Sequence, residues 1–218
     1  MTDHHSANST SAVAHQFDDA DQQRKASTLG MWVFLVTEVM FFGVVFAGYA
    51  MYRAAYPAEF SHASQHLNVF LGTLNTAILI TSSFTMALSV YAASTGKRKT
   101  LCCFLILTVI LGLAFLGIKS VEYAHKFKEH LVPGPHFFAE GGKQTQLFFC
   151  FYFAMTGLHA FHMIIGIGAM IWLLTESWKG GYSPAYHTPV ELAGLYWHFV
   201  DIVWIFLFPL LYLIGRHG

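Results

Sequence analysis

The chain has 218 residues, of which 55% are hydrophobic, 17% aromatic and 11% charged, and its formal net charge at pH 7 is zero. An ordinary soluble domain has roughly 25% charged residues, so this composition excludes a typical soluble core and indicates a membrane protein. The balanced charge gives no sign of a nucleic-acid partner or an acidic substrate.

Residues 1–28 form a polar N-terminal tail. A secretory signal needs a basic start followed by an apolar core, and this tail has neither, so we expect it to remain on the mature protein. His4 and His5 are neighbours in the tail, but two histidines in such a segment are more typical of solvent-exposed residues than of a metal site.

Five apolar segments follow, each near the roughly 20 residues that a transmembrane helix needs. They cover about residues 29–51, 69–93, 101–117, 146–174 and 192–214. Residues with turn chemistry separate them, in predicted loops at 56–66, 95–99, 119–145 and 180–189. We therefore expect an all-α polytopic membrane protein, with residues 29–218 forming one bundle of five transmembrane helices.

Lys and Arg residues are nearly balanced between the two sides of this topology, and the predicted loop 119–145 carries four lysines. The compact cluster Lys97, Arg98 and Lys99 between two spans is the strongest local signal. By the positive-inside rule it favours a cytoplasmic N-terminus and, with five spans, a periplasmic C-terminus.

Glu38 lies about ten residues into the first predicted span. An ionised carboxylate at that depth is costly and is not expected to face lipid. Two interpretations stay open: Glu38 is a neutral acid bonded to a neighbouring helix, or it takes part in handling protons.

Three histidines and a second acid occupy other spans. His159 and His162 are three residues apart, and His198 and Asp201 repeat that spacing in the fifth span, so each pair shares one helix face. Histidines on two helices could clamp a haem or a metal. Hydrogen bonds across helices or contacts with lipid headgroups are the more common role of such residues, and this is the interpretation that we favour.

Other polar and aromatic residues have simpler predicted roles. Glu122 follows Lys119 by one turn, which predicts an exposed ion pair at the membrane interface. The cysteines lie in apolar stretches without paired zinc-site spacing, so we expect free, buried thiols: Cys102, Cys103 and Cys150. Five aromatic residues near span ends are predicted to form an interfacial belt: Trp32, Trp172, Trp178, Tyr182 and Tyr196.

Five short motifs occur in order along the predicted spans. They are Gly-Met-x-x-Phe-x-x-x-Glu-Val-x-Phe-Phe at 30–42, Leu-Asn-Thr at 74–76, Glu-Tyr at 122–123, Gly-x-His-x-x-His-x-x-x-Gly at 157–166 and Tyr-Trp-His-Phe-Val-Asp at 196–201. Each motif is weak by itself, but the series resembles subunit III of the haem-copper respiratory oxidases. Mitochondrial members have two further helices before the glutamate-bearing helix, so the chain is similar to the shorter bacterial forms.

The resemblance implies a non-catalytic subunit of a proton-translocating cytochrome c oxidase in the bacterial inner membrane. It implies no metal, haem or copper in this chain, with haem and copper in partner subunits, and bound phospholipid. The implied partners are the catalytic subunit I, subunit II and other small subunits, and a respiratory supercomplex is a further assembly to consider. By position, Glu38 resembles a carboxylate that reacts with carbodiimides near the proton-uptake side, and His198 resembles a histidine close to a phospholipid headgroup.

Other functions stay open. A quinol oxidase also has a five-helix subunit III, and a related accessory protein accompanies nitric oxide reductases. A dihaem membrane cytochrome would pair His159 or His162 with His198 around iron. An independent transporter ranks last, because the sequence shows no inverted repeat and no pair of interrupted helices.

Overall fold

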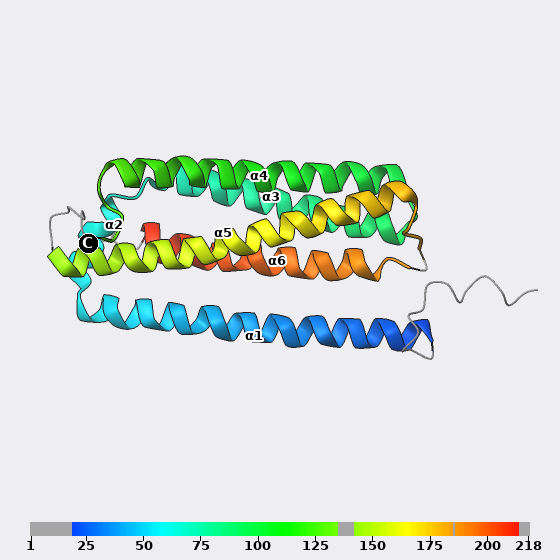
Figure 1. The fold of residues 1–218 in the computed structure, drawn as a ribbon, viewed down its shortest axis with the longest axis horizontal. Coiled ribbons are helices and arrows are strands. Elements are labelled where there is room, and N and C mark those ends of the chain that lie inside the picture. The colour runs from blue at the N-terminus through cyan, green and yellow to red at the C-terminus, as the bar shows by residue number, and fades with distance from the viewer. Residues whose placement is uncertain (1–18, 135–141, 185, 214–218) are drawn as a thin grey trace, which may run out of the picture.

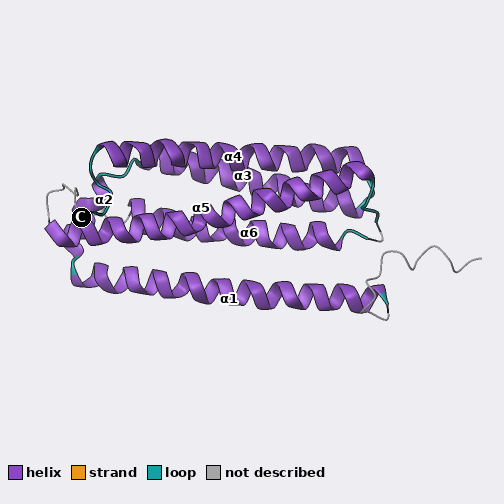
Figure 2. Ribbon diagram, viewed as in Figure 1, coloured by secondary structure: helices purple, strands orange, loops and turns teal. Residues whose placement is uncertain are grey.

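The computed structural model describes residues 19–134, 142–184 and 186–213. Its helices are α1 (Ala20–Ala55), α2 (Pro57–Gln65), α3 (Val69–Ser94), α4 (Arg98–Lys128), α5 (Gly142–Lys179) and α6 (Thr188–Phe208), which continues into a π-helical turn, η2 (Pro209–Leu213). Every regular element in the described residues is helical (Figure 2). The tail histidines His4 and His5 lie outside the described residues.

Within those residues, five helices are long and apolar enough to cross a membrane: α1, α3, α4, α5 and α6. Helices α3 to α6 lie side by side, and α1 runs along the bundle against α5 and α6 (Figure 1). The short helix α2 lies at the end where α1 turns back toward α3. The predicted all-α fold with five membrane helices is confirmed.

Helix bounds differ from the sequence prediction at several places. Helix α1 begins at Ala20, inside the predicted tail, because Oδ1 of Asp19 accepts a hydrogen bond from the backbone N–H of Gln22 at 2.6 Å and caps the helix. The predicted loop 56–66 contains α2, whose first turn begins with Pro57. Helix α4 continues to Lys128, so the predicted loop 119–145 is partly helical.

Trp197 of α6 fills the centre of the bundle. A Cβ atom on Gly112 of α4 would lie 2.9 Å from its ring, and one on Gly166 of α5 would lie 2.8 Å away. The indole N–H donates to Oγ of Ser82 in α3 at 3.0 Å. Two glycines therefore allow three helices to close around one large, fully buried side chain.

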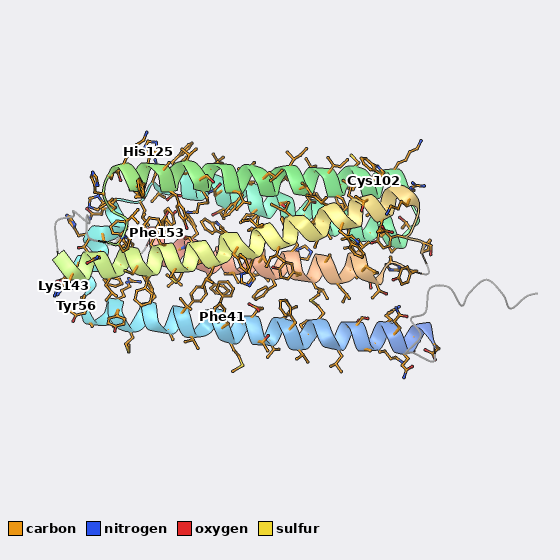
Figure 3. All side chains as sticks on the ribbon, in the orientation of Figure 1. Phe41, Tyr56, Cys102, His125, Lys143 and Phe153 are labelled. Carbon is orange, nitrogen blue, oxygen red and sulfur yellow. The ribbon has the colours of Figure 1, made fainter. Side chains whose placement is uncertain are left out.

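Helix α1 touches the bundle along a narrow seam. Leu35, Phe42 and Tyr49 are its buried large apolar residues, spaced seven apart on one helix face. The Tyr49 hydroxyl donates to the carbonyl of Leu210 at 2.8 Å. Many other side chains of α1 project away from the bundle (Figure 3), so most of its surface is left for lipid or for another protein.

Two predictions about individual side chains are wrong in part. Tyr196 is not an interfacial belt residue, because it is 7% exposed and its hydroxyl donates to the carbonyl of His162 at 3.0 Å. The cysteines are free, as predicted, but only Cys102 is buried. Cys103 and Cys150 are exposed on helix faces that are not covered by the bundle.

Candidate functional site

The site with the clearest chemistry joins α1 to α5 near the middle of both helices. Oε2 of Glu38 lies 3.0 Å from Nε2 of His162, and both side chains are largely buried. The other ring nitrogen, Nδ1, lies 2.8 Å from the carbonyl oxygen of Leu158. A carbonyl only accepts hydrogen bonds, so Nδ1 carries a hydrogen.

This geometry leaves one proton between Glu38 and His162. If Glu38 is a neutral acid, it donates to the free lone pair on Nε2, and if the proton has moved, an imidazolium donates to a carboxylate. The pair has no net charge in either arrangement, which suits a position inside a membrane. The geometry therefore allows Glu38 and His162 to share a proton.

Aromatic rings surround this pair. The Phe42 ring centroid lies 5.2 Å from that of His162 and 6.2 Å from that of Phe199. The backbone carbonyl of His162 accepts the Tyr196 hydroxyl. These contacts help to hold the imidazole in one orientation toward Glu38.

A second polar cluster lies deeper than the sequence predicted. Lys119 and Glu122 form the predicted ion pair, with Nζ 2.9 Å from Oε2, but their side chains are only 6% and 3% exposed. The Tyr212 hydroxyl donates to Oε1 of Glu122 at 2.6 Å and accepts from Lys119 at 2.7 Å. The prediction of an exposed interfacial pair is wrong, because the π-helical end of α6 covers it.

Aromatic rings complete the surroundings of the buried ammonium group. Nζ of Lys119 lies 4.7 Å from the ring centroid of Trp204, 5.2 Å from that of Tyr212 and 5.4 Å from that of Tyr152. These distances are within the range of cation–π attraction. One pattern in the sequence points to this cluster, a lysine and a glutamate one turn apart at the end of an apolar span, but no pattern identifies Tyr212.

His159 is fully buried between two aromatic side chains. Its ring centroid lies 5.3 Å from that of Phe115 and 5.2 Å from that of Trp204. Neither ring nitrogen has a hydrogen-bond partner among the described residues. His159 therefore occupies a packing position in the core.

His198 and Asp201 line a groove of about 460 Å³ between α3 and α6. Nδ1 of His198 lies 2.6 Å from Oγ of Ser83. With a rise of 1.5 Å per residue, His198 is about 15 Å along α6 from Thr188, near the middle of a bilayer core of about 30 Å. The sequence missed Ser83, because no pattern in α3 distinguishes it from the other small polar residues.

The three candidate histidine ligands do not converge. His162 contacts Glu38, His198 contacts Ser83 and His159 packs between Phe115 and Trp204. In the part of the chain that the structure describes, no three His, Cys, Asp or Glu side chains are placed to hold a metal ion. The arrangement does not fit a haem held between His198 and either histidine of α5.

Fold and site together define a class: a multi-pass helical membrane protein with buried, internally paired ionisable groups. The family model described as "Cytochrome c oxidase subunit III" matches residues 8–216. The chain belongs to this family and is subunit III of a haem-copper oxidase. Membership implies association with oxidase subunits I and II.

Curated relatives of both oxidase types are similar to the chain. A probable quinol oxidase subunit 3 of Staphylococcus haemolyticus is 30% identical over 91% of this chain and 94% of its own length. A cytochrome c oxidase subunit 3 of Alkalihalophilus pseudofirmus is 31% identical over 91% of this chain and 92% of its own length. A cytochrome bo(3) ubiquinol oxidase subunit 3 of Pseudomonas aeruginosa is 30% identical over 93% of this chain and 92% of its own length.

Proposed function

We propose that the chain is a non-redox subunit that stabilises the catalytic subunit of a terminal oxidase and supports its proton uptake. The Glu38–His162 pair is the observation that carries the proton-related part. It holds one exchangeable proton at mid-membrane depth, where a carboxyl group without a function would be costly to keep.

The electron donor of the complex is proposed to be cytochrome c, with quinol as the alternative. Relatives of nearly equal similarity carry both names, so identity alone does not separate the two. Donor binding belongs to other subunits in this proposal.

A cytoplasmic N-terminus and a periplasmic C-terminus are proposed for a bacterial inner membrane. Lys119 is buried and paired with Glu122, so it does not count among the loop cations that opposed this orientation. The cluster Lys97, Arg98 and Lys99 lies at the same end of the bundle as the start of α1 (Figure 1). Both points favour that end as the cytoplasmic one.

Bound phospholipid is part of the proposal. A polar pocket of about 560 Å³ lies at the opposite end of the bundle, between α3 and α4. His125, Lys126 and Glu129 line it, and Nζ of Lys126 lies 2.7 Å from Oε2 of Glu129. Both signs of charge are present at the membrane surface, which suits a zwitterionic headgroup better than the mid-membrane position of His198 does.

Purification in mild detergent tests the proposal. The chain is tagged, co-purifying proteins are identified by mass spectrometry, and an optical spectrum of the complex is recorded. A haem-copper catalytic subunit and its haem bands are expected, and the companion subunits identify the donor. A nitric oxide reductase among them would change the assignment, and a chain that purifies alone with haem would overturn it.

A further inference from the structure

One continuous groove runs along α6 on the side that faces α1 and α3. Its central part, between α3 and α6, has a volume of about 460 Å³. A neighbouring part of about 390 Å³ extends to Thr28 of α1 and Glu191 of α6. Ala87 and His198 line both parts, so the two form a single trough with α6 as its floor.

Asp201 lies on the floor of this trough. The residue is 4% exposed, and neither carboxyl oxygen has a partner among the described residues. The Ser83 hydroxyl lines the same trough and lies beside the Asp201 carboxyl group, but its hydrogen bond is to Nδ1 of His198, at 2.6 Å. A buried polar group without a partner is rare in a folded protein, so Asp201 points to a group that is supplied from outside this chain.

The depth of Asp201 in the membrane limits which molecules can supply a hydrogen-bond donor to it. Asp201 is central in the membrane-spanning segment Thr188–Leu213. Headgroups and interfacial water begin about 15 Å from the centre of a hydrocarbon core that is about 30 Å thick. Acyl chains reach Asp201 but carry no donor, so lipid alone leaves the carboxyl group unpaired.

We infer that this trough seats a transmembrane helix of another oxidase subunit, which brings a hydrogen-bond donor to Asp201. The inference rests on the proposed function, because it needs a multisubunit complex. The donor belongs to the side chains that act in this way between membrane helices: Ser, Thr, Asn, Gln, His, Arg or Lys.

The shape of the trough suits a helix. It extends along α6 from Glu191 to Ile205, which is about 21 Å at 1.5 Å per residue. Ala87 is an exposed, small lining residue that permits close backbone approach. The large apolar side chains Phe84 and Ile205 are 63% and 48% exposed and would pack against the sides of the incoming helix.

Site-specific crosslinking in the intact complex tests the inference. A photoreactive benzoylphenylalanine is placed at Phe84 or Ile205 in the trough, and at Ile110 of α4 as a control that is 55% exposed but outside it. We expect the two trough positions to crosslink to a membrane-spanning peptide of one partner subunit, identified by mass spectrometry. Crosslinks from Ile110 to the same peptide, or adducts of the trough positions with lipid or quinone only, would overturn it.

Substitution of Asp201 provides the second arm. Asp201→Leu removes both acceptors, and we expect the amount of co-purifying partner subunit to fall several-fold. Asp201→Asn keeps one acceptor and is expected to retain more partner. Each variant is checked for helix content by circular dichroism, and unchanged partner recovery with Asp201→Leu would contradict the inference.

The two arms separate this inference from the proposed function. If no oxidase subunit co-purifies with the unmodified chain, the proposed function fails. If oxidase subunits co-purify and the crosslinks lead to a different face, the oxidase assignment stands and the assignment of the trough is wrong.

Discussion

Nζ of Lys119 lies 2.7 Å from the hydroxyl of Tyr212, although 93 residues separate them in the chain. The contact joins the middle of the sequence to the end of α6, and Glu122 bonds to both partners. A charged pair so deeply buried is sensitive to the loss of either member, because the remaining charge has no water to solvate it.

Lys119→Met is therefore expected to destabilise the folded protein by about 3–5 kcal/mol, the range found when one partner of a buried ion pair is removed. The double variant Lys119→Met with Glu122→Gln removes both charges and is expected to recover most of that loss. Reversible unfolding in mixed micelles, followed by circular dichroism, measures the free energy of unfolding.

A matched control exists on α5. Lys179 and Glu176 form an ion pair with the same three-residue spacing, but the Lys179 side chain is 69% exposed. Lys179→Met should change the free energy of unfolding by no more than about 1 kcal/mol. Equal effects of the two lysine substitutions would show that burial of Lys119 contributes nothing to its role.

The helices could be predicted because each span needs about 20 apolar residues, and this signal is local. The ends of the helices could not be predicted in the same way. Helix α4, for example, continues beyond its apolar run through Lys119, Glu122 and Lys126. Nζ of Lys126 donates to the carbonyl of His66, a contact between distant segments. Polar residues that find such partners remain helical, and hydropathy alone does not reveal the partners.

The sequence identifies the ionisable residues of the candidate site and those that share a helix face, but not their partners on other helices. Glu38, His162 and His198 were recognised because ionisable side chains are rare in membrane spans. That His162 contacts Glu38, and that Ser83 lies beside His198, depends on how the helices pack. The spacing of His159 and His162 shows that they share a helix face, but it does not show what faces them.

Packing around Trp197 gives the next prediction. Gly166→Ala places a Cβ atom 2.8 Å from the indole ring, so the ring or α5 must move. The expected loss is about 1–3 kcal/mol, as for overpacking of a filled core. The shift in the unfolding midpoint measures it.

Gly168→Ala on the same helix is the control. No heavy atom lies within 4 Å of a Cβ atom at Gly168. Alanine is a better helix former than glycine by about 0.5–1 kcal/mol, so this variant should be as stable as the parent or slightly more stable. A larger loss with Gly168→Ala than with Gly166→Ala would contradict the packing described for Trp197.

His159→Phe separates a packing role from a haem-ligand role. The imidazole lies between Phe115 and Trp204 and has no hydrogen-bond partner among the described residues. An aromatic replacement should change stability by less than about 1.5 kcal/mol. The optical spectrum of the purified complex should stay the same, and loss of a haem band would restore His159 as a ligand candidate.

Glu38→Gln tests the proton-related role of the central pair. The amide can still bond to Nε2 of His162 at the position that Oε2 now occupies, so we expect the subunit to assemble. An amide does not release a proton near neutral pH, so proton uptake or the number of turnovers before inactivation should fall. Both are measured with the complex reconstituted in vesicles, under continuous turnover.

Glu191→Gln serves as the control, because Glu191 also pairs with a histidine, with 3.1 Å between Oε1 and Nε2 of His187. This second pair lies at the start of α6, where the Glu191 side chain is 39% exposed. Water can therefore exchange protons with His187 in place of Glu191. Its substitution should leave proton uptake and endurance unchanged. If Glu38→Gln behaves in the same way as Glu191→Gln, Glu38 acts only by holding α1 against α5, and the proton-related part of the proposal fails.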